Sequence, residues 1–210
     1  MHRRWRVFWL ACSIALVILL SLIPAVRRGA LRSAGGLLIV SDKIEAADVG
    51  VMTESGQAGE LEMSDLYHQR VIPCVLVLAP AQDAVAEELA RRGVRRDDFV
   101  VTTLVQLGVP LAAITTIDSG EGGTTESARA LVEWVRTHPS RILVVVDPTH
   151  SRRYRRTLMR EWPVGVEPPR MTYPRANPFR AEDWWVSRRT RRDGIVELAR
   201  LAWDYLWHPW

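Results

Sequence analysis

The feature that most constrains the fold of this chain is a strand-turn-helix pattern in the stretch 141–156, RILVVVDPTHSRRYRR. Five consecutive apolar residues, 142–146, are mostly β-branched, which is typical of a strand buried on both faces. The run ends before Pro148, and an arginine-rich helix is expected after His150. Strands of this kind that alternate with helices make an α/β fold.

The rest of the chain repeats this alternation. Strands are expected at 37–40, 48–52, 74–79, 112–117 and 142–146, and helices at 60–69, 83–92, 97–107, 125–137, 152–161 and 187–206. Apolar residues of the last helix, Ile195, Leu198, Ala199 and Ala202, recur at helical spacing. The proline-rich segment 163–183 is expected to be loop-like. The sequence therefore predicts a Rossmann-like parallel sheet with helices on both faces.

An uncharged apolar segment near the N-terminus, 7–23, reaches bilayer length when it is extended to 5–26. A cleavable signal peptide would have a shorter apolar core and small residues before the cut, whereas Ile23 or Arg32 would occupy the −3 position here. The sequence therefore predicts one retained N-terminal transmembrane helix.

A pair of glycines, Gly35 and Gly36, is interpreted as a hinge after this anchor. The chain is thus predicted to divide into an anchor with its flanks, 1–34, and an α/β domain, 35–210. Three arginines precede the apolar segment and three follow it, so charge alone does not orient the protein in the membrane.

The charge is modestly positive, at +4, and Lys43 is the only lysine. No basic run is interleaved with stacking aromatic residues, so nucleic acid is not expected as a partner. Arginines near tryptophans fit a lipid surface better, and inner-membrane lipid is the expected partner. Cys12 lies in the apolar segment and Cys74 in a predicted core strand, so the two are not expected to form a disulfide.

The tryptophans near the C-terminus have two interpretations. Trp184 and Trp185 are followed by arginines and can either cover one end of the core or contact anionic headgroups, and we favour the core. For Trp207 and Trp210 both interpretations stay open.

Several polar residues follow the predicted strands. The carboxyl ends of parallel strands meet at one edge of a doubly wound sheet, where backbone N–H groups and helix dipoles bind anions. This edge is expected to hold Ser55 and Gly56 after one strand and Asp147 and His150 after another. Together with the arginines that follow, these residues predict an anionic or phosphorylated ligand.

His150 is the candidate general acid or base, because imidazole titrates near neutral pH. Asp147 is expected to orient it, and Glu126 is the candidate acid partner. Each residue also has an ordinary structural interpretation, since a histidine after a strand often caps a turn. Thr124 and Glu126 likewise fit an N-cap and a first helical turn. No spacing matches a metal motif, and no cofactor is identified.

Several short fragments occur in the order and spacing of one known family. They are Ala47-Asp48, Leu66-Tyr67, VLVLAP from Val75, Gly108-Val109-Pro110, then Thr124, Glu126 and Ala128 of an NTxENA-like helix start, His150 and Arg153 of an HxxR pattern, and Trp184-Trp185. On these residues the chain resembles the SanA/YdcF/ElyC family from about 37 to 206. Members look like single-span inner-membrane proteins whose domain lies outside the cytoplasm and influences envelope integrity, so the resemblance implies the same location here.

The resemblance implies that Arg153, Thr124 and Ser127 bind the ligand. The chain departs from the family where Thr53-Glu54-Ser55-Gly56 replaces a glycine loop, which keeps a ligand farther from the backbone. Gly123 and Ser127 also replace two asparagines, and Asp147 replaces a small hydroxyl residue. The fold is therefore implied more strongly than any ligand or activity.

Three functions are compatible with these observations. The first is an anchored envelope protein that binds or processes a phosphorylated cell-wall or carrier-lipid intermediate, with phosphate on Arg153, a proton on His150 and Glu126 positioning the substrate. The second is an interaction module that has lost the ligand site. The third is a nucleotide- or S-adenosylmethionine-binding domain, which would require the domain to face the cytoplasm.

Overall fold

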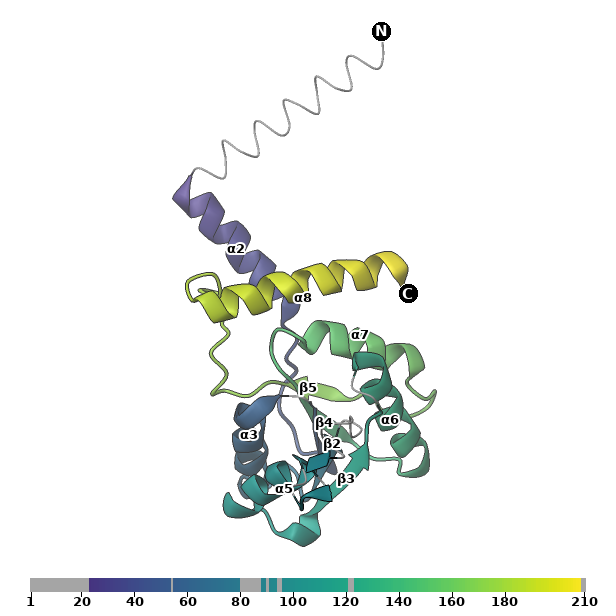
Figure 1. Cartoon of the computed structure of the whole chain (residues 1–210). Coiled ribbons are helices and arrows are strands. Elements are labelled where there is room, and N and C mark those ends of the chain that lie inside the picture. Colours follow the sequence, from purple (N-terminus) through teal and green to yellow (C-terminus); the bar gives the residue numbers. More distant parts are fainter. Residues whose placement is uncertain are drawn as a thin grey trace.

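The protein is built on a five-stranded parallel sheet in the order β3-β2-β1-β4-β5 (Figure 1). The computed structural model describes residues 23–53, 55–79, 88–89, 91–93, 96–120 and 123–208. The strands are β1 (Val49–Met52), β2 (Val75–Ala79), β3 (Ile114–Asp118), β4 (Ile142–Val145) and β5 (Arg170–Thr172). The helices are α2 (Pro24–Leu38), α3 (Gly56–His68), α5 (Arg96–Gln106), η1 (Leu111–Ala113), α6 (Thr124–Thr137), α7 (Ser151–Glu161) and α8 (Arg188–Trp207). The predicted α/β, Rossmann-like sheet is confirmed.

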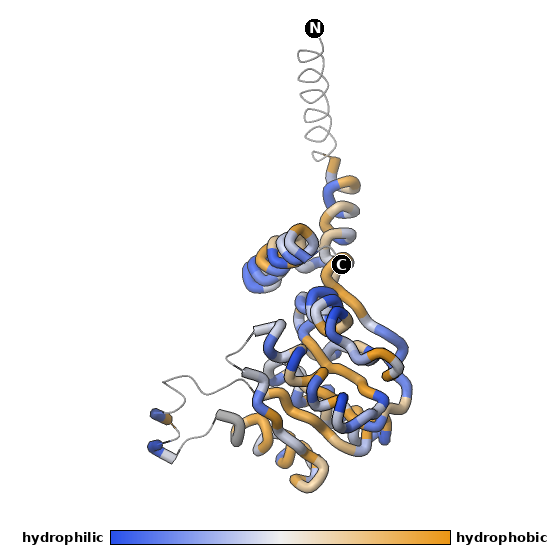
Figure 2. Tube along the Cα trace, turned by 90° about the vertical axis from the view of Figure 1, so that its right-hand side faces the viewer, coloured by the Kyte–Doolittle hydropathy of each residue, from blue (hydrophilic) through white to orange (hydrophobic). Residues whose placement is uncertain are grey.

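Helices cover both faces of the sheet, as predicted. Side chains of α6 and α7 pack on one face and those of α3 and α5 on the other, so the strands lie in a hydrophobic interior (Figure 2). At the centre, Val51 of β1 lies opposite Leu76 of β2 and Val144 of β4. All three are buried, which explains why these strands are continuous apolar runs rather than alternating ones.

Four of the five predicted strands are confirmed to within two residues, but the fifth strand lies elsewhere. The 163–183 segment, predicted as a loop, contains β5. Met171 in β5 is fully buried, and its N–H donates to the Asp42 carboxylate while its carbonyl accepts from the Asp42 N–H. Three residues among prolines are too few to give a periodic signal, so this strand is specified by its tertiary contacts.

The strand predicted at 37–40 is wrong, because α2 ends within it. The backbone there bonds to α7 instead of to a neighbouring strand. Ser151 Oγ donates to the Leu38 carbonyl and accepts from the Val40 N–H, and Arg152 donates to two further carbonyls at 37 and 39. Side chains thus satisfy the polar groups that a sheet would otherwise satisfy.

The predicted hinge at Gly35 and Gly36 is also wrong, since both glycines lie inside α2. A Cβ added at Gly35 would lie 2.6 Å from Cδ1 of Trp184, so glycine permits close packing there. The Trp184 indole donates to the Leu31 carbonyl at 2.7 Å. Trp184 therefore covers one end of the core, as predicted, and α2 continues unbroken across the 34/35 boundary.

The last helix, α8, packs on the molecule with an unexpected face. Its buried residues include Glu197 and Asp204 as well as Gly194 and Leu201. Of the apolar residues predicted to face the core, Leu198 does pack against its end cluster, whereas Ile195, at 55%, Ala199 and Ala202 are exposed. Polar contacts thus orient α8 together with Leu198 and Leu201.

The predicted transmembrane segment, 7–23, lies outside the described residues except for Ile23. Within the part of the chain that the structure covers, no helix combines the length and the apolar character needed to cross a membrane. The predicted helix at 83–92 also lies mostly outside the described residues.

Candidate functional site

A cavity of about 670 Å³ opens at the carboxyl edge of the sheet. The chain connects β1 to β2 and β3 on one side and β4 to β5 on the other, so the loops after β1 and β4 diverge at this point. Ligands of open α/β sheets bind at such a switch point. The cavity is lined by Thr53, Gly123, Thr124, Ser127, Asp147, Thr149, His150, Arg153, Tyr154, Asn177, Pro178, Phe179, Arg189, Thr190, Arg192, Asp193, Val196, Glu197 and Arg200.

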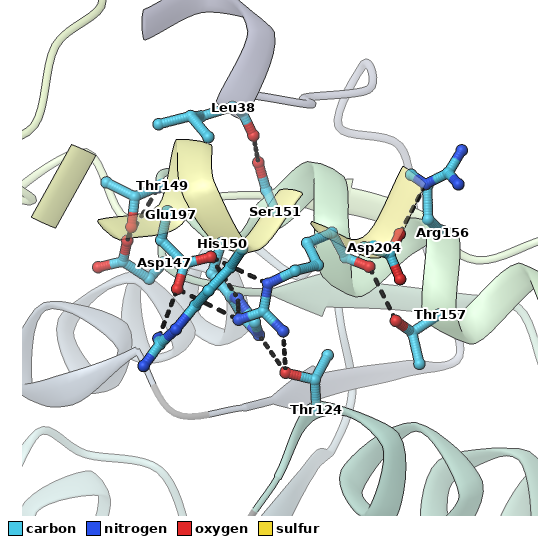
Figure 3. A network of polar contacts seen from close by, with 12 residues as sticks. Leu38, Thr124, Asp147, Thr149, His150, Ser151, Arg156, Thr157, Glu197 and Asp204 are labelled. Carbon is cyan, nitrogen blue, oxygen red and sulfur yellow. Dashed lines mark hydrogen bonds and ion pairs between the residues drawn. The ribbon is translucent and has the colours of Figure 1, made fainter. Parts of the chain in front are cut away.

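Three helices bring their polar residues together in one wall of the cavity (Figure 3). His150 precedes α7, Thr124 begins α6, and Glu197 comes from α8. His150 Nε2 lies 3.3 Å from Thr124 Oγ1, and Nδ1 lies 3.5 Å from Glu197 Oε2. His150 and Arg153, predicted together from sequence, do share this site.

The Arg153 guanidinium lies at the centre of this network. It donates to Thr124 Oγ1 at 2.6 Å and to His150 Nδ1 at 2.8 Å. Its Nε and Nη2 also donate to the two oxygens of Glu197, at 3.0 and 3.2 Å. Because every one of these partners is protein, Arg153 holds the cavity wall together.

These contacts assign the protonation of His150. Nδ1 accepts from the Arg153 guanidinium, so it carries no proton, and the proton of a neutral ring is on Nε2. Nε2–H then donates to Thr124 Oγ1. Both ring nitrogens are therefore engaged while the imidazole is neutral.

Glu197 supplies the carboxylate of the site, a role predicted for Glu126. It is 6% exposed and also accepts from Arg200 Nη1 at 2.7 Å. Burial would raise the pKa of Glu197, but the hydrogen bonds that it accepts from the Arg153 and Arg200 guanidiniums outweigh burial and hold the pKa well below 4.5. Glu197 is therefore ionised at neutral pH.

Glu126 has an exposed side chain that does not line the cavity. It folds back over the loop before α6, because a Cβ on Gly123 would lie 2.3 Å from Glu126 Oε2. The N-cap of α6 is Gly123 rather than Thr124, so the Thr124 hydroxyl is left to bind Arg153 and His150. The predicted first-turn position of Glu126 is confirmed, while its side chain lies against Gly120 and Gly123 and is not part of the cavity lining.

Asp147 lines the cavity, but its carboxylate does not orient His150. Oδ1 accepts from the N–H and hydroxyl of Thr149, and Oδ2 accepts from Asn177 Nδ2 at 2.9 Å. The contact with His150 is through the backbone, where the His150 N–H donates to the Asp147 carbonyl. Asp147 thus fixes the turn after β4 and connects it to the segment after β5.

The remaining predicted ligand-binding residues differ in position. Ser127 lines the cavity, with its Oγ 3.3 Å from the Tyr154 hydroxyl. Burial raises the pKa of Tyr154, so that hydroxyl stays protonated. Ser55 is buried and donates to the Thr53 carbonyl, and Gly56 begins α3, but neither lines the cavity.

The other arginines of α7 are bound to protein groups. Arg155 forms an ion pair with Asp42, and Arg156 and Arg160 both pair with Asp204 of α8. Burial would raise the pKa of Asp204, but these two guanidiniums hold it below its usual range. The arginine run that predicted an anionic ligand therefore joins α7 to its neighbours.

Positive charge at the cavity comes instead from α8. Arg189 and Arg192 line the rim and are exposed. Arg192 contacts the adjacent Asp193 at 3.1 Å, whereas no ion pair engages Arg189 within the described residues. The amino-terminal ends of α6 and α7 also lie at the cavity, and neither has a side-chain cap. Uncapped helix N-termini present N–H groups and a positive dipole to a bound anion.

Sequence reasoning missed Glu197 because the apolar side of α8 suggested the opposite orientation. One signal was present, since Glu197 and Asp204 are seven residues apart and share a helix face with Gly194 and Leu201. A small residue beside two acids on one face is consistent with close packing against an arginine-rich helix.

The side chains that the structure describes include no group of three or more His, Cys, Asp or Glu placed to hold a metal ion. The side chains that line the described cavity wall offer hydrogen bonding, charge pairing and the imidazole of His150.

No protein-family model matches this chain, and no curated protein matches it. A solved structure with some similarity is the crystal structure of the aureusimine biosynthetic cluster reductase domain. It is 13% identical, with a TM-score of 0.29, over 57% of this chain and 39% of that one. This chain therefore spans less than half of that domain, and a likeness at this level carries no functional argument.

Proposed function

We propose that the cavity binds a phosphorylated small molecule and that the protein does so at the bacterial inner membrane. The observation that supports anion binding is the meeting of two uncapped helix N-termini, those of α6 and α7, at one cavity that the first turns of α8 also line. Arg189 and Arg192 add formal positive charge at its rim. Helix dipoles and guanidiniums together favour a doubly charged phosphate over a neutral ligand.

The size of the cavity favours a ligand larger than phosphate itself. Its volume of about 670 Å³ is in the range of small-molecule sites. Pro178, Phe179 and Val196 form an apolar part of the lining. A ligand with a phosphate at the helix N-termini and an organic group against these side chains would match both the charge and the size of the cavity. A phosphorylated cell-wall or carrier-lipid intermediate is a ligand of this kind.

Binding is supported better than proton transfer. His150 Nδ1 accepts from Arg153 and Nε2–H donates to Thr124, so a neutral ring has no free lone pair to remove a proton from a ligand. His150 and Arg153 are therefore proposed to position the cavity wall. An interaction module is the alternative, and it would not require an occupied cavity.

The membrane location rests on sequence. The apolar segment 7–23 has the length of a span, and the resemblance to SanA-like proteins implies a domain outside the cytoplasm. An exposed amino-terminal part of α2, 23–30, follows this segment directly. We propose that 7–23 anchors the protein and that the cavity takes up its ligand on the outer side of the inner membrane.

The binding proposal is tested with the full chain purified in detergent. Binding of inorganic phosphate and of a phosphorylated sugar is measured by isothermal calorimetry for Arg189→Gln/Arg192→Gln and for the control Arg188→Gln/Arg191→Gln. The control removes the same charge from exposed positions of α8 that do not line the cavity. The rim variant is expected to bind at least about tenfold more weakly, since charge-assisted hydrogen bonds contribute about 1.5–3 kcal/mol each.

Equal weakening in both variants would show that only net charge matters and would contradict the proposed site. Absence of binding by the unaltered chain to either phosphate probe would contradict phosphate as the ligand class. If the chain instead bound an adenosine nucleotide or S-adenosylmethionine, the nucleotide-binding alternative would be favoured.

A further inference from the structure

We infer that the outer face of α8 lies in the headgroup layer of an anionic bilayer. This face consists of Ile195, Ala199, Ala202, Trp203 and Leu206; Ala199 and Trp203 form its edge, where they also line a groove against α6 and α7. It is distinct from the cavity, and the inference goes beyond ligand binding.

In α8 the usual distribution of polar and apolar residues is inverted, because acidic residues are on the buried side and apolar residues are on the outer face. The buried side of the helix carries Glu197 and Asp204, which are ion-paired to α7. The outer face is apolar and exposed, with Trp203 at 62% and Leu206 at 76%. Trp207 lies beside it, with its ring 5.1 Å from that of Trp203. A contiguous exposed apolar surface of this kind marks an interaction site.

Positive charge lies at the amino-terminal end of this face and on the neighbouring α2. Arg188 and Arg192 occupy its amino-terminal end, and Arg27, Arg28 and Arg32 are exposed on the neighbouring α2. Aromatic and aliphatic residues on one side of a helix with arginines near them are typical of helices that lie in a membrane interface. Each arginine near an anionic surface adds about 1 kcal/mol of attraction.

The position of α2 brings this face to the correct depth. The apolar segment ends at Ile23, and α2 first contacts the end cluster of the core at Leu31, whose carbonyl accepts from Trp184. Eight residues of helix rise about 12 Å. A helix radius of about 5 Å leaves about 7 Å between the outer face and the end of the apolar segment, which equals one headgroup layer.

The arrangement of the helices agrees with this depth. In Figure 1, α8 crosses the molecule between the sheet and the amino-terminal end of α2. Since the buried face of α8 is turned toward α7, its outer face is turned to the side from which α2 comes.

The test uses the full chain in vesicles with a single spin label. Leu206→Cys in a Cys12→Ser/Cys74→Ser background reports on the outer face, and Glu133→Cys in the same background is the control, since Glu133 is an exposed side chain of α6. The label on native Cys12, in a Cys74→Ser chain, reports on the anchor itself. Power saturation with oxygen and with a nickel chelate measures depth in vesicles with and without phosphatidylglycerol.

The label at Leu206 is expected to show a higher ratio of oxygen to nickel accessibility than the label at Glu133, with the difference reduced in purely zwitterionic vesicles. Equal ratios at both positions, while Cys12 lies in hydrocarbon, would overturn the inference and leave the anchor intact. Water exposure of Cys12 would instead contradict the anchor. The spectrum of the label at Leu206 could instead show dipolar broadening that disappears when unlabelled protein is added. That result would identify a second copy of the chain as the occupant of this face and would also overturn the inference.

Discussion

The substitution Glu197→Gln tests whether this carboxylate holds α7 and α8 together. In the folded protein, Glu197 accepts two hydrogen bonds from Arg153 and one from Arg200, and it is 6% exposed. The Arg153 side chain is itself 16% exposed. Glutamine keeps the shape and one acceptor but removes the charge, so a buried guanidinium loses its counter-ion.

The expected cost follows from this burial. Removal of one partner of a buried ion pair costs about 3–5 kcal/mol, because the other charge stays desolvated. The amide oxygen of glutamine still accepts one hydrogen bond, so we expect about 3 kcal/mol, at the low end of that range. The contribution of Arg200 is small, since its side chain is 61% exposed.

Urea unfolding of the full chain in detergent, followed by circular dichroism, measures this cost. A loss of about 3 kcal/mol corresponds to a shift of the midpoint of roughly 1–2 M urea. Glu133→Gln is the matched control, because Glu133 forms an exposed pair with Arg136 and is expected to change stability by less than about 1 kcal/mol. Glu197→Leu/Arg153→Met removes both buried charges and is expected to recover most of the loss.

The pH dependence gives a second readout. Because the pKa of Glu197 is lowered in the folded state, its stabilisation is fully present above its ordinary value of 4.5 and is lost as pH falls toward the folded pKa. The difference between the unaltered chain and Glu197→Gln should therefore be constant above pH 4.5 and shrink below it. A Glu197→Gln midpoint equal to that of Glu133→Gln would refute the structural role of this ion pair.

Two further outcomes are expected. Gly35→Ala places a Cβ 2.6 Å from Trp184 and should lower the free energy of unfolding by about 1–3 kcal/mol in the same urea assay. Gly36→Ala is the control, because its Cβ meets nothing within 4 Å and the substitution should be neutral or stabilising. Equal effects of the two substitutions would contradict the packing of α2. Asp147→Ala leaves Asn177 Nδ2 without its acceptor. The substitution should weaken phosphate binding severalfold in calorimetry, with little loss of helix content. An unchanged affinity would show that this turn does not shape the cavity.

The core strands could be predicted from the sequence because their apolar runs are continuous. Ile142 to Val146 is buried on both faces, and no surface pattern competes with that reading. The strand β5 could not be predicted, since Met171 is aligned by Asp42, 129 residues away in sequence. Hydrogen bonds over such separations leave no local periodicity.

The candidate site divides in the same way. His150 and Arg153 are three residues apart, and the strand-turn-helix pattern places both at the sheet edge. Their carboxylate partner could not be inferred from the sequence. The strand order places Glu126 at the same sheet edge as His150, which made it the obvious candidate. Glu197, by contrast, comes from a helix whose orientation depends on its own ion pairs. Periodicity ranks helix faces by apolar content, and α8 buries the polar one.

The uninterrupted course of α2 has a mechanical consequence. Gly35 is wedged against Trp184, and the same indole also packs against Gly194 of α8. We therefore expect a rotation applied at Pro24 to reach α8, and with it Glu197 in the cavity wall, rather than to be absorbed by a swivel before the sheet. The helix would then act as a lever whose short arm ends at Trp184, and torque on its amino-terminal end would alter the shape of the cavity.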